Sequence, residues 1–270
     1  MIVTGQAKTA THATNLIRND SSLDVSADTV RSALKDNGLR AVIKKKKPRL
    51  FARHKRQRLE FAKVHKDWTI EDWKKVIWSD ETKVNRLRSD GREWTWKKLG
   101  SLTLDQHVQK TVKHGGGSLM MWGCMTAQGV GFACRIDSTM DAELYTSILR
   151  DELIQTLEYC GLDNNEIVFQ HDNDPKHTSH LATQWLSENE IAVFQWPPQS
   201  PDLNLIEHLW QHLKRRLAEY EEEPKSIHEL WERLEAEWNQ ITPDICVNLT
   251  ESMPKRMAAV LKANGGYTRY

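Results

Sequence analysis

The chain has 270 residues, of which 39% are hydrophobic and 28% charged, and its net charge at pH 7 is +1. This length can bury a sizeable core, either in one large domain or in a catalytic domain with a small companion. The four cysteines show neither zinc-site nor disulfide-framework spacing, no apolar run approaches the ~18 residues that span a bilayer, and the N-terminus lacks a signal-peptide core. These features exclude a membrane-spanning or disulfide-stapled protein and predict a soluble intracellular one.

The near-neutral charge conceals a strongly basic segment. From Arg40 to Lys66 there are twelve Lys and Arg against one acid, Glu60, whereas residues 67–270 sum to −10. Basic segments of this density commonly bind phosphates through their positive potential. A solvated linker is the alternative interpretation.

Residues 1–42 predict a small helical unit. Residues 11–20 suit a first helix, and residues 26–39 suit a clearer second one, because Ser26 can cap its start and Gly38 can end it. The polar face of the second helix would suit the DNA major groove, as in a helix-turn-helix. A generic helical hairpin fits the periodicity equally well, but the basic run that follows favours DNA binding.

The DNA-binding candidates lie on that polar face and in the basic run: Arg31, Ser32, Lys35, Arg40, Lys44, Lys45, Lys46, Lys47 and Arg49. The four lysines at 44–47 also match a nuclear import signal, which predicts a nuclear protein. We expect a helix-turn-helix unit over residues 1–42, a basic linker over 43–68 that contains a helix at 53–65, and a catalytic domain over 69–270.

The catalytic domain is expected to combine strands and helices. The expected elements are strands at 74–84 and 92–98, a hairpin at 117–136, a helix at 140–161, a strand at 166–174, a helix at 179–190, a strand at 191–197, and helices that begin near 205 and at 226. This order predicts a mixed α/β sheet with flanking helices, in which acids at strand ends face a common edge.

Three acids stand at marked positions in this order. Asp80 closes an apolar run, Asp172 follows a later strand with 91 residues between the two, and Glu207 begins a helix after a further 34 residues. Each acid has a structural alternative. Asp80 and Asp172 can each make a turn, and Glu207 stands three residues after Asn204, which is the spacing of a capping box.

Together the three acids predict a metal site. Magnesium prefers hard oxygen ligands and commonly takes one or two carboxylates per ion. Two ions about 3.5–4 Å apart can stabilise the entering and leaving oxygens of a phosphoryl displacement. Since like charges in one site disfavour joint ionisation, clustered acids argue for a cation. We therefore expect Asp80, Asp172 and Glu207 to be catalytic residues that bind two Mg²⁺ or Mn²⁺ ions.

Two neighbours of Asp172 are supporting candidates. We expect Asn173 and His177 to hold the acidic turn by hydrogen bonds; a ligand or acid–base role for His177 is the alternative. The prolines at 197, 198 and 201 would stiffen the approach to Glu207.

Three blocks, at residues 79–81, 171–179 and 196–210, resemble the catalytic blocks of cut-and-paste transposases in the Tc branch of the Tc/mariner superfamily. The 34-residue interval before Glu207 is the spacing of that branch. Residues 110–131 resemble its central block and residues 252–270 its C-terminal end, so the resemblance covers residues 25–270.

The resemblance implies an RNase H-like catalytic domain in which Asp80, Asp172 and Glu207 bind the metal. It also implies a DNA transposase that cuts double-stranded DNA at the terminal inverted repeats of its element and joins the freed 3′-hydroxyls to a target. The target would be a TA step, whose easy deformation suits indirect readout. Family members contact a partner subunit through an insertion, which would correspond to residues 97–118, so a homodimer is also implied.

The chain departs from the family pattern in two places. Family members carry two helix-turn-helix units, and residues 1–42 have room for only the second, which would bear on recognition of the inverted repeats. Leu205 stands where the family commonly has Pro. The alternatives are a truncated or inactive relic that only binds DNA, and an RNase H-like nuclease acting on RNA, which leaves the helix-turn-helix unexplained.

Overall fold

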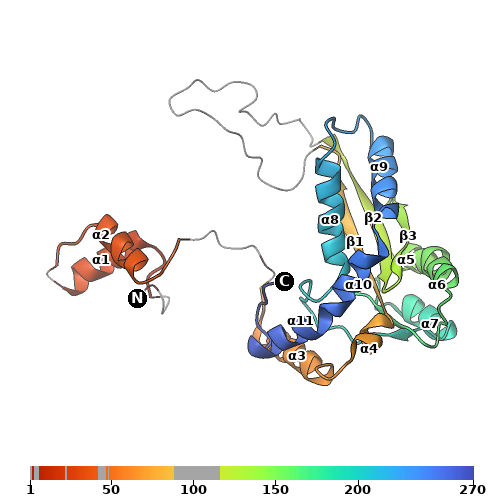
Figure 1. Ribbon diagram of the computed structural model, residues 1–270, viewed down its shortest axis with the longest axis horizontal. Coiled ribbons are helices and arrows are strands. Elements are labelled where there is room, and N and C mark those ends of the chain that lie inside the picture. Colours follow the sequence, from red (N-terminus) through yellow and green to blue (C-terminus); the bar gives the residue numbers. More distant parts are fainter. Residues whose placement is uncertain (1, 3–5, 22, 42–46, 48, 88–115) are drawn as a thin grey trace. The chain divides into compact units, whose positions relative to one another are not determined.

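The computed structural model describes residues 2, 6–21, 23–41, 47, 49–87 and 116–270 (Figure 1). Contacts divide the chain into two compact units, Met1–Pro48 and Arg49–Tyr270. The strand expected at 92–98 and most of the insertion expected at 97–118 lie outside the described residues. Within the described residues, no helix is long and apolar enough to cross a membrane.

The smaller unit contains two helices, α1 (Ala10–Asp20) and α2 (Ala27–Asp36), which confirms the two that the sequence predicts. Thr9 and Ser26 cap their starts, and each accepts a hydrogen bond from the backbone N–H three residues on. Gly38 follows α2 with φ of 74°, a left-handed conformation that glycine adopts without strain.

The boundary between the units differs from the expected one. Residues 49–68 belong to the larger unit, where the helix α3 (Ala52–Val64) packs against α11 (Met253–Lys262). Phe61 is buried in the core, and the Arg58 side chain is 1% exposed. The other Lys and Arg of α3 face solvent. The basic composition of this helix therefore describes its outer face, while its inner face is part of the folded core.

The larger unit is built on a five-stranded mixed sheet in the order β3-β2-β1-β4-β5. The strands are β1 (Val76–Asn85), β2 (Ser118–Thr126), β3 (Gly129–Ile136), β4 (Val168–Gln170) and β5 (Ala192–Val193). β1, β2 and β3 pair antiparallel, whereas β4 runs parallel to β1 and β5 parallel to β4. The predicted hairpin is confirmed, with its turn between Thr126 and Gly129.

Helices cover both faces of the sheet (Figure 1). One face, which we call the α8 face, packs against α3, α11, α4 (Ile70–Lys74), α8 (Ile206–Ala218), α9 (Ile227–Asn239) and α10 (Pro243–Glu251). The opposite face, the α5 face, packs against α5 (Ala142–Ile148), η3 (Leu149–Leu153), α6 (Ile154–Cys160) and α7 (His180–Glu188).

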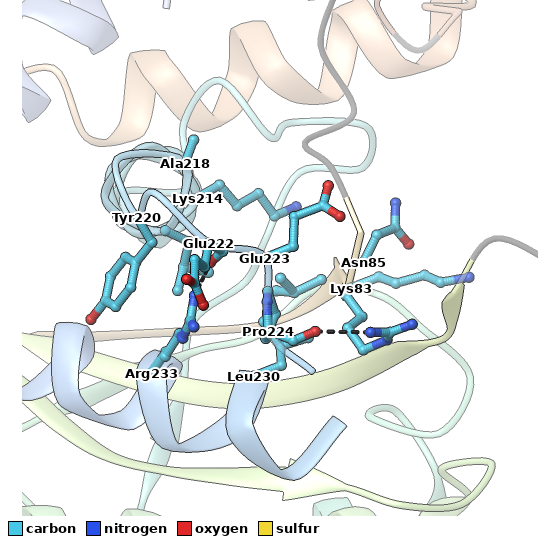
Figure 2. A pocket seen from close by; sticks show the side chains of 13 residues that line it. Lys83, Asn85, Lys214, Ala218, Tyr220, Glu222, Glu223, Pro224, Leu230 and Arg233 are labelled. Atoms are coloured by element: carbon cyan, nitrogen blue, oxygen red, sulfur yellow. Dashed lines mark hydrogen bonds between the residues drawn. The ribbon is translucent and has the colours of Figure 1, made fainter. Parts of the chain in front are cut away.

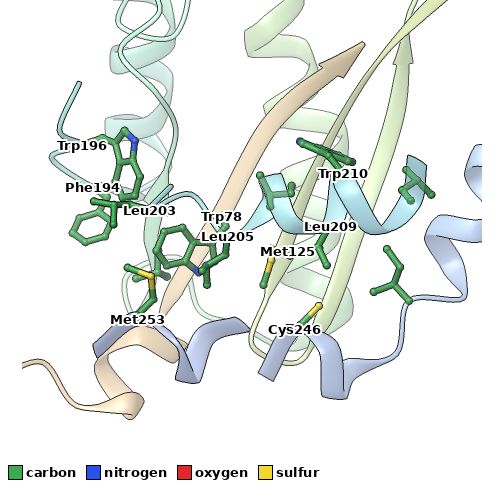
Figure 3. Close-up of a cluster of buried hydrophobic side chains, with 14 of the residues drawn as sticks. Trp78, Met125, Phe194, Trp196, Leu203, Leu205, Leu209, Trp210, Cys246 and Met253 are labelled. Carbon is green, nitrogen blue, oxygen red and sulfur yellow. The ribbon is translucent and has the colours of Figure 1, made fainter. Parts of the chain in front are cut away.

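The pleat of β1 divides its side chains between two cores. Val76 and Trp78 belong to the core of the α8 face, whereas Ile77 between them belongs to that of the α5 face, because successive residues of a strand point to opposite sides. In Figure 3, Trp78 lies beside Leu205 on the α8 face, near Met253. This packing fixes the start of α8 against the middle of β1.

On the α5 face, the long helix predicted at 140–161 is confirmed. It runs without interruption from α5 through a π-helical turn, η3, into α6, and ends at Gly161 with φ of 62°. Its buried residues Leu149 and Leu153 pack with Phe169 of β4.

Candidate active site

Asp80 lies inside β1, and the pleat directs it toward the α8 face, since Trp78 two residues before it packs there. The sequence placed Asp80 at a strand end. Instead, β1 stays paired with β2 as far as Asn85, while its pairing with β4 ends at Trp78. Asp80 therefore stands just past the last residue pair of the two parallel strands.

Asn204 holds the Asp80 carboxylate. Its Nδ2 donates to Asp80 Oδ2 at 3.1 Å and to the Ser79 carbonyl oxygen at 3.3 Å. The structural alternative for Glu207, a capping box with Asn204, is not formed, because Leu205 is the N-cap of α8 and no side chain caps the helix. Asn204 reaches across to β1 instead, and its buried Oδ1 makes no hydrogen bond to any described residue.

Asp172 follows β4 and forms an acidic turn, as predicted. Its Oδ1 accepts hydrogen bonds from the Asp174 N–H at 2.9 Å and from His177 Nδ1 at 2.7 Å. Asn173 Nδ2 donates to the Trp196 carbonyl oxygen at 2.9 Å and so ties the turn to the segment after β5. The predicted hydrogen bonds from Asn173 and His177 to this region are therefore present.

Glu207 lies in the first turn of α8 and is half-buried. The helix start is fixed by the apolar residues on either side of it, because Leu205 and Ile206 are fully buried in the core of the α8 face. Figure 3 shows Leu205 and Leu209 on this buried side of the helix.

The three predicted acids line one cleft of about 640 Å³. The acids come from β1, from the turn after β4 and from α8, and the segment 197–201 forms part of the wall. The start of α3 contributes three further residues, which the sequence did not single out: Phe51, Arg53 and His54. Arg53 is exposed, so the cleft carries a cation beside its acids.

Burial and neighbouring charges shift the pKa values of the acids in the cleft. Burial, together with the charges of Glu207, Glu81 and Asp172, raises the pKa of Asp80 to about 8. Burial also raises the pKa of Glu207, against the opposing charge of Lys214. Within the described ranges, no three His, Cys, Asp or Glu side chains converge enough to enclose a metal ion. The carboxylates therefore share a cleft without forming a coordination shell.

His177 connects the cleft to the α5 face. Its Nδ1 lies 2.7 Å from Asp172 Oδ1 and its Nε2 lies 3.1 Å from Glu81 Oε1. Burial lowers the pKa of His177, but hydrogen bonds to the two carboxylates outweigh burial and raise it to about 9. The pKa of Asp172 is lowered, since His177 and the Asp174 N–H outweigh the opposing effect of burial. Both ring nitrogens can then donate, as only the protonated imidazole allows.

Two aromatic side chains lie beside the His177 ring. The Tyr145 ring lies 4.1 Å from it and the His171 ring 5.5 Å, nearly parallel at 13°. The Tyr145 hydroxyl is 2.8 Å from His171 Nδ1. Burial and the charge of His177 lower the pKa of His171 to about 4, so the His171 ring is neutral.

The DNA-binding candidates are placed only in part. Arg31, Ser32, Lys35 and Arg40 are exposed in the smaller unit, where Arg31 pairs with Asp28. Arg49 begins the larger unit, with its guanidinium 4.9 Å from the centre of the Phe51 ring. Lys47 is described, whereas Lys44, Lys45 and Lys46 lie outside the described residues.

A second cavity of about 260 Å³ lies at the opposite end of α8, between that helix and the end of β1 (Figure 2). It is bordered by Lys83, Lys214, Tyr220 and Arg233, and also by Arg86, which donates to the Pro224 carbonyl oxygen at 2.8 Å. None of the predicted catalytic residues borders it. Along α8, about 10 Å of helix separates Glu207 from Lys214, the first residue of that helix to border this cavity.

Known proteins match both units. A family model described as DDE superfamily endonuclease matches residues 75–231, and a model described as transposase, of Tc3 helix-turn-helix type, matches residues 7–67. The Tc1 transposase of Caenorhabditis elegans is 39% identical over 265 residues, which cover 97% of this chain and 95% of the relative. The chain belongs to the Tc/mariner superfamily of transposases. It is a DNA transposase, as the sequence predicts.

Solved structures show the same fold for this transposase. The mariner Mos1 paired end complex with Mg superposes with a TM-score of 0.83 at 18% identity, over 99% of this chain and 77% of that chain. The catalytic domain of Mos1 transposase superposes with a TM-score of 0.64 at 17% identity, over 83% of this chain and all of that one. The predicted RNase H-like catalytic fold with a helical N-terminal unit is thereby confirmed.

Proposed function

We propose that this transposase cleaves and joins DNA in the cleft lined by Asp80, Asp172 and Glu207, with divalent metal bound to these carboxylates. One observation carries the proposal: acids from three separate elements line the same cleft. The pKa of Asp80, raised to about 8 partly by its acidic neighbours, supports it. Carboxylates that lie close together repel one another, and a bound cation would relieve this repulsion.

The donor atoms suit Mg²⁺ or Mn²⁺. All three predicted ligands offer hard oxygens, and the buried Oδ1 of Asn204 beside Asp80 is a further oxygen that makes no hydrogen bond to the described residues. The chemistry supplied by two bound ions would be activation of water and neutralisation of charge on the entering and leaving oxygens of the phosphodiester. The Mos1 paired end complex, which shares this fold, contains Mg.

The residues of the chain would divide the remaining tasks. Asp80, deep in the cleft and held by Asn204, would fix the position of the site on the sheet. Asp172 would offer Oδ2, to which no described residue donates a hydrogen bond. Arg53, on the wall formed by α3, would attract the phosphate backbone of the substrate strand.

The partners and location are proposals of the same kind. The helix-turn-helix unit would bind double-stranded DNA at the inverted repeats through Arg31, Ser32 and Lys35, and the cut ends would join a TA target. Two copies would act together to hold two DNA ends. The lysines at 44–47 would direct the protein to the nucleus.

The test replaces Asp172 by Asn in the full chain and measures cleavage of a duplex that carries the inverted repeats flanking the gene. Cleavage in Mg²⁺ or Mn²⁺ should fall at least about 100-fold, since one metal ligand loses its charge. Binding of the same duplex should remain. Asp67→Asn, an exposed acid after α3, serves as the matched control and should cleave like the wild type.

Retained cleavage by the Asp172→Asn variant would overturn the assignment. A wild-type protein that binds the duplex but cuts no DNA in either metal would support the inactive relic instead. Cleavage confined to RNA would support the nuclease alternative.

A further inference from the structure

We propose that Glu81 and His177 form a positioning pair for Asp172, which holds one oxygen of that carboxylate so that the other is presented to metal. This inference rests on the proposed metal-binding role of Asp172. Neither residue would touch the metal. Glu81 has no functional role predicted from the sequence, because nothing in the sequence distinguishes this neighbour of Asp80 from an ordinary surface acid.

The pleat of β1 separates Glu81 from the catalytic acids. Asp80 points to the α8 face, toward Asn204 and Glu207, so its neighbour Glu81 points to the α5 face. There Glu81 Oε1 lies 3.1 Å from His177 Nε2. Adjacent residues of one strand therefore serve the cleft from opposite sides of the sheet.

His177 links Glu81 to Asp172, which follows the end of β4. Its side chain is 3% exposed, and its other nitrogen lies 2.7 Å from Asp172 Oδ1. The same oxygen accepts the Asp174 N–H. Two donors on Oδ1 fix the carboxylate plane, while Asp172 Oδ2 accepts no hydrogen bond from the described residues. The Asp172 side chain is 54% exposed, so this second oxygen is accessible from the cleft.

The surroundings keep the imidazole in one orientation. The Tyr145 ring lies 4.1 Å from the His177 ring, and the His171 ring stacks on it at 5.5 Å. Glu81 is itself restrained, because its side chain is 12% exposed and Lys176 Nζ lies 3.8 Å from Oε2. A buried ring that has aromatic neighbours and a carboxylate at each nitrogen is suited to orient Asp172 rather than to move toward a substrate.

The experiment measures the Kd of Mn²⁺ for the full chain by electron paramagnetic resonance, alongside single-turnover cleavage of the inverted-repeat duplex. His177→Ala should weaken Mn²⁺ binding about 10–100-fold, the usual effect of losing a residue that orients a metal ligand. Cleavage should slow by a similar factor, while the KM for DNA stays unchanged. His180→Ala, an exposed histidine three residues on, is the matched control and should leave both values unchanged.

Substitutions of Glu81 separate positioning from ligation. Glu81→Ala should weaken Mn²⁺ binding about 10-fold, whereas Glu81→Gln should stay within about 3-fold of the wild type, because its amide oxygen still accepts from His177 Nε2. The double variant Glu81→Ala/His177→Ala should bind Mn²⁺ no more weakly than His177→Ala alone, since the two residues act in one chain.

Three results would overturn the pair. The first is a Glu81→Gln variant as defective in Mn²⁺ binding as Glu81→Ala, which would make Glu81 a metal ligand. The second is additive losses in the double variant. The third is a wild-type Mn²⁺ affinity in both His177→Ala and His177→Gln. The glutamine variant keeps one hydrogen-bond donor and serves as a second test if the alanine variant fails to fold.

The metal measurement also separates this inference from the proposed function. A wild type that binds Mn²⁺ with the expected variant pattern, yet cuts no DNA, leaves the pair standing and removes the catalytic assignment. If the wild type cuts DNA but the variants bind Mn²⁺ with normal affinity, the catalytic assignment stands and the positioning pair is overturned. A wild type that binds no Mn²⁺ overturns both.

Discussion

The two faces of the catalytic sheet bury different side chains. Seven tryptophans lie in or against the core of the α8 face: Trp68, Trp73, Trp78, Trp196, Trp210, Trp231 and Trp238. On the α5 face, the described residues include two, Trp122 and Trp185, among mainly aliphatic neighbours. At its acid end, the α5 face instead carries two hydrogen-bonded pairs, Glu81 with His177 and Tyr145 with His171, whose imidazole rings lie nearly parallel.

The cleft is supported in a different way from each face of the sheet. Asp80 and Glu207 emerge from the aromatic α8 face, where large rigid rings fix the backbone positions of β1 and α8. Asp172 is held from the α5 face by directed hydrogen bonds. Apolar packing thus determines the backbone positions of Asp80 and Glu207, whereas hydrogen bonds determine the orientation of the Asp172 carboxylate. Changes that weaken one face should leave the other largely intact.

The largest effect is expected from Arg58→Met, which weakens the α8 face. Arg58 forms two hydrogen bonds of 2.7 Å with the Asp202 carboxylate and also bonds Ser200 Oγ and the Gly265 carbonyl oxygen. Its loss removes one member of a buried ion pair and should cost about 3–5 kcal/mol of unfolding free energy. Urea unfolding followed by tryptophan fluorescence would measure it, since most described indoles lie on this face.

The exposed Arg56 on the same helix supplies the control, and Arg56→Met should shift the unfolding midpoint little. A loss below about 1 kcal/mol for Arg58→Met would show that the guanidinium is replaceable by apolar packing, as some buried ion pairs are.

A matched pair of glycines compares the two faces directly. A Cβ at Gly131 would lie 2.5 Å from Thr156 Cγ2 and 2.6 Å from Cys124 Sγ on the α5 face, whereas one at Gly123 would lie 3.0–3.3 Å from Trp210 and Trp238 on the α8 face. Gly131→Ala should therefore cost more than Gly123→Ala, by about 1–3 kcal/mol. Thermal unfolding of both variants measures the difference. A larger loss for Gly123→Ala would mean that Trp210 and Trp238 adjust to the added methyl group less readily than the neighbours of Gly131 do.

A smaller effect should appear in the pH dependence of stability. Burial lowers the pKa of His65 below its ordinary value of 6.5, although its hydrogen bond to the Phe61 carbonyl oxygen opposes this. Below pH 6.5 the unfolded chain binds a proton that folded His65 does not, so stability falls as pH falls. His65→Gln should show a shallower decline than the wild type in unfolding series from pH 7 to pH 5. Equal slopes would place the pKa of His65 at its unfolded value.

The smallest effect is expected for Leu205→Pro, which restores the residue common in the family. Leu205 has φ of −70°, which proline adopts, and its N–H makes no hydrogen bond to the described residues. The variant loses part of a buried side chain but restricts the unfolded chain, so the free energy of unfolding should change by less than about 1.5 kcal/mol. A larger loss, measured by urea unfolding, would show that Asn204 cannot precede proline in its present conformation.

Local features of the fold were predictable because they depend on neighbouring residues. Ser26 caps α2, Ser179 caps α7 and Ser226 caps α9. Gly161 ends the helix predicted at 140–161. The acids Asp172 and Glu207 also fall where the order of elements placed them.

The features that the sequence did not reveal depend on contacts between distant residues. Asn204 has capping spacing but bonds to Asp80, 124 positions earlier. The basic helix α3 resembles a linker until Arg58 is seen against Asp202. The contact between Glu81 and His177 depends on both the pleat of β1 and the turn after β4, which are apparent only in the folded structure. None of these pairings changes a local pattern, so no periodicity could have signalled them.

The end of the chain also bears on how the protein is handled in the laboratory. The Thr268 hydroxyl donates to Asp202 Oδ2 at 2.6 Å, the Tyr267 hydroxyl accepts the Leu50 N–H at 3.2 Å, and the Tyr270 ring lies 4.7 Å from the Arg256 guanidinium. These residues fasten α3 to the loop that leads into Glu207. An affinity tag joined after Tyr270 would therefore be attached close to the segment that positions Glu207, the proposed catalytic acid, so a tag at another position is the better choice for activity measurements.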